Sequence, residues 1–235
     1  MKIALWFGHN TIHNGTFDSG SVGNGKKEAD ITKATVYKLA ELLNNMGHDT
    51  YIIDVYNKRF TASSKKMASK KAHQYRADKT NQINPDICLD IHVNSGGGTG
   101  PECWVYSTSS KSYPWARKIV NSIAKETGLR NRGVRVNPSY WSLSMTKCPT
   151  IIVEGGFIDS KKDMDILTPD KYALSIAKAF GQVKEEAKIS NEPSKWAKDS
   201  WQWGIDKGLT DGNRPKDNAT REEVVTMLKR LYKAK

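Results

Sequence analysis

Hydrophobic residues in this chain fall into two patterns, short apolar runs and longer segments with helical spacing. The apolar runs, each of a length typical of a buried strand, are Ile3–Phe7, Thr50–Val55, Ile87–Val93, Cys103–Tyr106 and Thr150–Glu154. The helical segments are Lys26–Gly47, a basic stretch that reaches Thr80, Pro114–Thr127 and Tyr172–Val183. Strands that alternate with helices predict an α/β fold, with a mainly parallel twisted sheet and helices on both of its faces.

A polar stretch, residues 185–194, predicts a linker between a domain of residues 1–184 and a small α-helical domain of residues 195–235. In the small domain, Trp196, Trp201 and Trp203 mark one amphipathic helix, and the capping box of Thr220 and Glu223 predicts the start of another. Two short helices bury little surface alone. We therefore expect this domain to need a partner, such as the first domain, a polymer or a second copy of the chain.

Polar, chemically active side chains follow or end three of the apolar runs. His9 comes just after the first run, His92 lies near the end of the third, and Glu154 ends the last. The carboxyl ends of parallel strands meet at one edge of a sheet, so these side chains are expected to lie together. Glu28 is expected in the first turn of a helix, where the ionised carboxylate that binds metals is favoured.

Two imidazoles and a carboxylate form a usual ligand set for catalytic zinc, which would leave Glu154 as a general base. Each of these residues alone has an ordinary structural explanation. A single histidine is more often a hydrogen-bonded structural residue, and Glu28 could be a helix-start charge. Spacing alone leaves both interpretations open for the four-residue site. The histidines His13 and His73 are weaker candidates, the first in a polar loop and the second in the basic stretch.

Five sequence pieces together resemble the type 3 family of N-acetylmuramoyl-L-alanine amidases, over Lys2 to Val183. They are Gly8-His9, Glu28, Ile91-His92-Val93-Asn94, Asn131-Arg132-Gly133-Val134 and residues 149–158. The resemblance implies that His9, Glu28 and His92 bind zinc (Zn²⁺) and that Glu154 is catalytic. Asn94 and Arg132 are candidate substrate-binding residues, although Asn94 could instead cap its loop. Asp90 departs from the family pattern, in which a serine is common.

The resemblance implies hydrolysis of the amide bond between the lactyl group of muramic acid and L-alanine in peptidoglycan. The C-terminal pattern, with Trp196, Trp201 and Trp203, resembles a single S-layer-homology module, which implies cell-wall binding or oligomerisation. The simple alternative is that these tryptophans only pack the domain. The combination resembles a bacteriophage endolysin, with a bacterial autolysin as the alternative. A zinc carboxypeptidase that trims the peptide stem and a non-catalytic wall-binding protein are the competing functions.

The chain is strongly basic, with 37 Lys and Arg against 25 Asp and Glu and a net charge of +12. Such a charge attracts polyanions, here nucleic acid, an anionic membrane or anionic wall polymers. The basic residues gather in residues 58–79, which read most simply as a solvated helix face and alternatively as a contact with the wall. No nucleic-acid-binding signature is found, so nucleic acid is not an expected partner.

No apolar run approaches the roughly 20 residues of a membrane span. The N-terminus lacks the features of a signal peptide. We therefore expect a protein that is made in the cytoplasm and acts on the wall after release or export.

Overall fold

The computed structural model describes residues 1–183, 193, 197–211 and 221–233. The chain divides into two compact units, Met1–Val183 and Lys184–Lys235. Each unit is described by itself.

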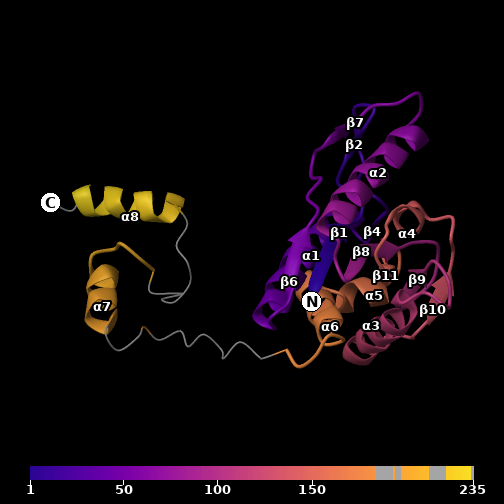
Figure 1. Cartoon of the computed structure of the whole chain (residues 1–235). Coiled ribbons are helices and arrows are strands. Elements are labelled where there is room, and N and C mark those ends of the chain that lie inside the picture. The colour runs from indigo at the N-terminus through magenta and orange to yellow at the C-terminus, as the bar shows by residue number, and fades with distance from the viewer. Residues whose placement is uncertain (184–192, 194–196, 212–220, 234–235) are drawn as a thin grey trace. The chain divides into compact units, whose positions relative to one another are not determined.

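A six-stranded sheet forms the centre of the first unit (Figure 1). Its strands, in spatial order, are β10 (Val134–Val136), β9 (Glu102–Val105), β11 (Thr150–Phe157), β8 (Ile87–Asn94), β1 (Lys2–Phe7) and β6 (Asp49–Ile52). The last four run parallel to one another, and β9 and β10 run in the opposite direction. The predicted α/β fold with a mainly parallel sheet is confirmed, with a reversed pair of strands at one edge.

Helices cover both faces of this sheet (Figure 1). On one face lie α1 (Glu28–Asn45), α3 (Ser112–Thr127) and α6 (Pro169–Ala177), and on the other lie α2 (Lys65–Ile83) and α4 (Trp141–Met145). Successive side chains of β1 point to opposite faces of the sheet and contact both helix layers. Phe7 stacks on Tyr37 of α1, and the Trp6 indole donates a 2.8 Å hydrogen bond to Thr80 of α2. The side chains between the layers form one hydrophobic core.

Several short elements of the first unit were not predicted. The expected loop of residues 10–25 contains the two-residue strands β2 (Ile12–His13), β3 (Thr16–Phe17) and β4 (Val22–Gly23). Strand β2 pairs with β3 and with β7 (Arg59–Phe60), and β4 pairs with β5 (Lys26–Lys27). The other unpredicted elements are α4, α5 (Lys161–Ile166) and β10. All of them are too short to show a hydrophobic period. Conversely, α6 ends at Ala177, six residues before the end expected from the apolar spacing.

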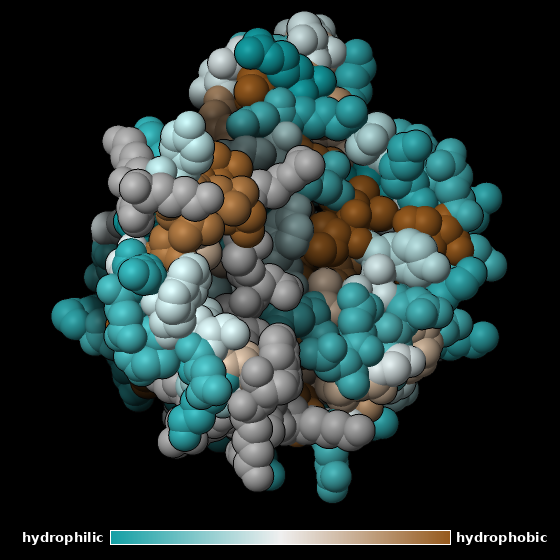
Figure 2. Space-filling model, turned by 90° about the vertical axis from the view of Figure 1, so that its left-hand side faces the viewer, coloured by the Kyte–Doolittle hydropathy of each residue, from teal (hydrophilic) through white to brown (hydrophobic). Residues whose placement is uncertain are grey.

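The second unit contains α7 (Lys198–Asp206) and α8 (Arg221–Lys233). Trp201 is half-buried and Trp203 is 48% exposed, whereas Trp196 and Thr220 lie outside the described residues. Large apolar side chains on α8 are also exposed. Brown hydrophobic patches are visible on the face of the molecule drawn in Figure 2. Among the described residues, no helix combines the length and the apolar character needed to cross a bilayer.

Candidate metal centre and active site

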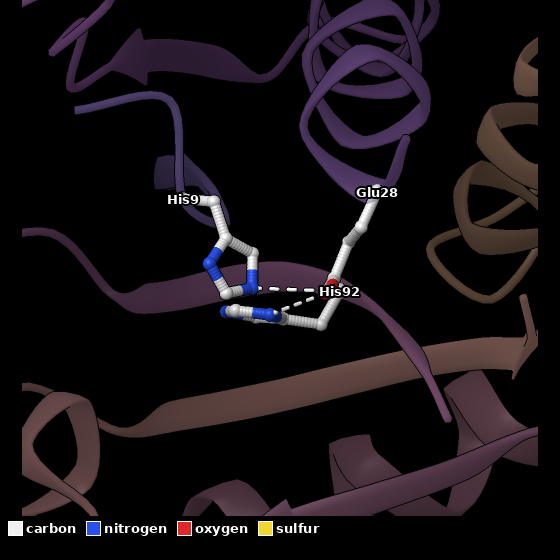
Figure 3. A group of neighbouring side chains, drawn as sticks. All are labelled: His9, Glu28 and His92. Carbon is white, nitrogen blue, oxygen red and sulfur yellow. Dashed lines mark hydrogen bonds and ion pairs between the residues drawn. The ribbon is translucent and has the colours of Figure 1, made fainter. Parts of the chain in front are cut away.

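His9, Glu28 and His92 meet at the carboxyl edge of the sheet (Figure 3). His9 lies two residues beyond the end of β1, His92 lies near the end of β8, and Glu28 is the first residue of α1. One nitrogen from each ring and one carboxylate oxygen all lie within 4.8 Å of one another. The predicted convergence of these residues is therefore observed.

The Glu28 carboxylate bridges the two imidazole rings (Figure 3). Its Oε1 lies 2.9 Å from Nδ1 of His92, and its Oε2 lies 3.1 Å from Nε2 of His9. Two backbone amides also donate to it, that of Val93 over 3.1 Å and that of Ser21 over 2.9 Å. These bonds hold Glu28 in one orientation although it is almost fully buried.

A second carboxylate holds the far side of each ring. Nδ1 of His9 lies 3.0 Å from both carboxylate oxygens of Asp18, and Nε2 of His92 lies 3.2 Å from Oδ1 of Asp90. Histidines that bind metals usually donate their other ring N–H to such a group, which fixes the ring and its tautomer. Each ring therefore presents one nitrogen toward the cluster and has the other one anchored.

Charge pairing controls the protonation of this cluster. Burial alone would lower the pKa of His9, but its bonds to Asp18 and Glu28 outweigh burial and raise the pKa to about 9. Burial likewise opposes the charge of His92, yet Asp90 and Glu28 raise its pKa well above the ordinary value. Burial would raise the pKa of Glu28, and the two rings instead hold it well below its usual range. Without metal, the two rings thus carry protons that compensate the carboxylates.

The backbone around His9 is built for this close approach. His9 has a φ of 63°, in the left-handed region that side chains rarely adopt, and its carbonyl accepts a 2.6 Å hydrogen bond from Nη2 of buried Arg76. A Cβ at Gly8 would lie 2.4 Å from the His92 ring. Glycine is therefore required at position 8 for His92 to pack against the end of β1.

Glu154 lies beside this cluster on the next strand. The register of β8 and β11 places it next to His92, and that of β11 and β9 places it next to Glu102, so the three residues form a row across the sheet. The Glu154 Oε2 atom is buried and has no hydrogen-bond partner. Burial raises the pKa of this carboxyl to about 8. It is thus an unpaired acid or base beside a candidate metal site.

All four residues line one cleft of about 580 Å³. Helix α2 contributes Lys66 and His73 to its lining. The segment 139–142 contributes Tyr140 and Trp141. A cleft next to a group that can hold a metal has the form of a catalytic site.

The two predicted substrate-binding residues differ in their positions. Asn94 lines the cleft and donates through Nδ2 to Glu102 over 2.9 Å. Arg132 does not line it; its Nε donates to Glu102 over 2.8 Å and its guanidinium lies over the Phe157 ring. Arg135 also pairs with Glu102, so two arginines compensate the charge of this buried acid, which lies in the row beside Glu154. A direct role in substrate binding remains a prediction for both.

Sequence reasoning missed several cleft residues. Asp90 offered a signal, since a charged residue inside an apolar strand needs a partner, and its partner is His92. His73 lies within the basic stretch, which gives no sign that it lines the cleft. Tyr140 and Trp141 had no periodic pattern around them, so only the fold brings them to the site.

Comparisons with known proteins identify a family and relatives that match the first unit. Residues 3–183 match the family described as N-acetylmuramoyl-L-alanine amidase. An uncharacterised protein of Clostridium perfringens, CPE1502, is 29% identical over 201 residues, which cover 82% of this chain and 55% of that protein. The endolysin of Bacillus phage SPP1 is 27% identical over 198 residues, covering 81% of this chain and 67% of the endolysin. The chain thus spans about half the length of the C. perfringens relative.

A solved structure shares the fold. The catalytic domain of the CD27L endolysin, which targets Clostridia difficile, superposes with a TM-score of 0.68 at 21% identity, covering 78% of this chain and 99% of that domain. The family match spans all four residues of the site and every strand of the sheet except for its first residue, Lys2. The chain therefore belongs to the N-acetylmuramoyl-L-alanine amidase family.

Proposed function

We propose that this protein is a zinc-dependent amidase that hydrolyses the bond between the lactyl group of muramic acid and L-alanine in peptidoglycan. One observation carries the proposal: Glu154, whose buried Oε2 atom has no hydrogen-bond partner, shares a cleft with a His-Glu-His cluster that could hold a metal. The family to which the chain belongs supports the same reaction.

The donor set fits zinc. Two imidazole nitrogens and a carboxylate oxygen within 4.8 Å of one another are ligands that zinc prefers, and three protein ligands leave a position open for water or substrate. His9, Glu28 and His92 would hold the ion, with Asp18 and Asp90 fixing the two rings. Because the rings carry protons in the metal-free protein, binding would release them.

Glu154 would then move the protons of the reaction. When bound, zinc polarises the scissile carbonyl and makes an attacking water more acidic. Glu154 accepts a proton from that water as it attacks the carbonyl carbon and delivers it to the departing nitrogen of L-alanine. Its position suits this task, since Glu154 lines the cleft and no other side chain is bonded to its Oε2 atom.

Digestion of purified cell walls tests this proposal. We expect mass spectrometry to find new free amino groups on L-alanine without new reducing sugar ends, and a chelator to stop the reaction. Glu154→Ala is expected to retain zinc and lose hydrolysis, while Glu41→Ala, a change at an exposed glutamate of α1, serves as the control. Retained activity in Glu154→Ala would reject the assigned role.

The same experiment separates the alternatives. A zinc carboxypeptidase would release the terminal residue of the stem peptide and leave the lactyl amide intact. A non-catalytic wall-binding protein would sediment with walls in the presence of chelator and release no product. Either result would replace the proposed activity.

We also propose that the second unit is an S-layer-homology-like module that binds cell-wall polymers or pairs with a second chain. Support comes from its exposed apolar side chains, among them Trp203 (48% exposed), Val225 (64%) and Leu228 (59%). Co-sedimentation with purified walls and analytical ultracentrifugation of Trp203→Ala in the full chain test the two roles. Unchanged wall binding and unchanged mass would exclude Trp203 from both.

The similarity to a phage endolysin supports a role in host lysis after release from the cytoplasm, with an autolysin as the alternative. Lysis of producing cells only when a membrane pore is co-expressed would favour the endolysin role. Lysis without a pore would argue against it.

A further inference from the structure

The cleft has two groups of lining residues with different chemistry. The α2 side contributes the ammonium of Lys66 and the imidazole of His73, and the segment 139–142 contributes the aromatic rings of Tyr140 and Trp141. The two groups meet where the His73 ring contacts Trp141 edge to face, with ring centroids 5.5 Å apart. A substrate in the cleft therefore has a polar basic side and an aromatic side available to it.

Lys66 gives the α2 side its charge. Among the described residues that line the cleft, it is the one lysine or arginine, and it is exposed. A neighbouring cavity of about 490 Å³ shares His9 and Lys66 with the cleft and adds Lys65 and Ser69 from the same helix. The basic side thus continues along α2 beyond the metal site, which gives room for an extended anionic ligand.

His73 offers a hydrogen-bond acceptor with a fixed orientation. Its Nδ1 lies 2.9 Å from the backbone carbonyl oxygen of Ser69, which can only accept, so Nδ1 carries the hydrogen. Burial lowers the pKa of His73 to about 4, helped by nearby Arg76, so the ring is neutral at pH 7. Nε2 consequently has a lone pair and no hydrogen, and it cannot stabilise an oxyanion. It can accept an N–H or O–H group from a ligand in the cleft.

Peptidoglycan next to the scissile amide has two chemically distinct parts. The glycan strand is a chain of uncharged sugar rings, whereas the stem peptide carries backbone N–H groups and free carboxylates. Lys66 and His73 complement the peptide, and aromatic rings suit the faces of sugars. We propose that the α2 side of the cleft binds the stem peptide, with Lys66 pairing with the free carboxylate of the residue after L-alanine and Nε2 of His73 accepting a peptide N–H. This assignment rests on the proposed amidase function.

Two soluble muropeptides that differ in one group test the role of Lys66. In one, the second stem residue carries a free α-carboxylate, and in the other this carboxylate is amidated. The wild-type protein is expected to show a KM about three- to tenfold lower for the free carboxylate, as expected for one ion pair in a partly solvated cleft. Lys66→Gln is expected to abolish this preference by raising KM for the carboxylate form only.

Lys70→Gln is the matched control, because Lys70 is an exposed lysine of the same helix that does not line the cleft. It should keep the wild-type preference. A preference retained in Lys66→Gln, or no preference in the wild type, would overturn the inference while leaving the amidase function intact. Failure of the wild type to cleave either muropeptide would instead reject the proposed function.

His73→Phe tests the acceptor. It keeps the ring and removes Nε2, and we expect KM for both muropeptides to rise about five- to tenfold with kcat within about twofold. His73→Gln, whose carbonyl oxygen can accept, should recover much of the loss, and zinc content measured by mass spectrometry should equal that of the wild type. An unchanged KM in His73→Phe, or a loss confined to kcat, would overturn the assignment of His73.

Discussion

Replacing Glu154 by glutamine is expected to stabilise the metal-free protein in alkaline solution while abolishing hydrolysis. The Oε2 atom of Glu154 is buried and has no hydrogen-bond partner, and burial raises the pKa of this carboxyl to about 8. Glutamine has nearly the same shape but never ionises. The comparison therefore isolates the free-energy cost of placing a charge at this position.

The size of the effect follows from the change in proton affinity. The pKa rises from its ordinary value of 4.5 to about 8, and each pKa unit is worth ~1.36 kcal/mol, so ionised Glu154 costs the folded protein on the order of 5 kcal/mol. Below pH 4.5 the carboxyl is protonated in both the folded and the unfolded chain, and this cost is absent. Between pH 4.5 and 8 only the unfolded chain ionises, so the wild type loses stability steadily. Above pH 8 the full cost is present.

Chemical unfolding of the chelator-treated proteins measures this cost. The free energy of unfolding of Glu154→Gln minus that of the wild type should increase from about pH 5 to about pH 8 and then level off. His9 and His92 are present in both proteins, so their own titrations largely cancel in the difference. Glu41→Gln, at an exposed site, is the control, and its difference in free energy of unfolding should stay within about 0.5 kcal/mol. A flat profile for Glu154→Gln would refute the argument that burial controls this carboxyl.

Three further predictions concern the metal. Gly8→Ala is expected to weaken zinc binding in equilibrium dialysis, because the new Cβ would lie 2.4 Å from the His92 ring. Gly47→Ala is the control: alanine is strained at the φ of 83° found there, away from the site, so this variant should lose stability but keep zinc affinity. Asp90→Asn is expected to reduce zinc affinity by about 10- to 100-fold in chelator competition, and an unchanged affinity would mean that His92 is oriented without it. Zinc affinity should rise from pH 6 to pH 9 with proton release in calorimetry, because the pKa of His9 is about 9 and protonated rings compete with the metal; pH-independent binding would contradict this.

The sheet and the central residues of the site were predictable because both depend on strands. Each long apolar run became a strand, and parallel neighbours bring residues that follow or end such runs to one edge. His9, His92 and Glu154 were placed by this rule alone. Glu28 followed from its position in the first turn of α1.

The remainder of the cleft depends on tertiary structure that leaves no periodic signal. Asp18 reaches His9 from a loop whose strands are two residues long, and Trp141 reaches His73 from a five-residue helix. His73 lies on a helix whose buried residues include alanine, threonine and arginine, so its sequence does not reveal which face points inward. The anchoring and lining residues of this site therefore required the structure.

The register of β9 against β11 limits which changes of sequence the cleft can accept. Glu102, the first residue of its strand, lies in the row beside Glu154; two arginines pair with it and Asn94 donates a hydrogen bond to it. A deletion of one residue in segment 95–101 that shifted the strand register would turn Glu102 toward the α3 layer and place the Cys103 thiol beside the Glu154 carboxyl. Changes that widen or narrow the cleft are therefore better made in residues 139–142. This segment lines the cleft, and none of its residues pairs with a strand of the sheet.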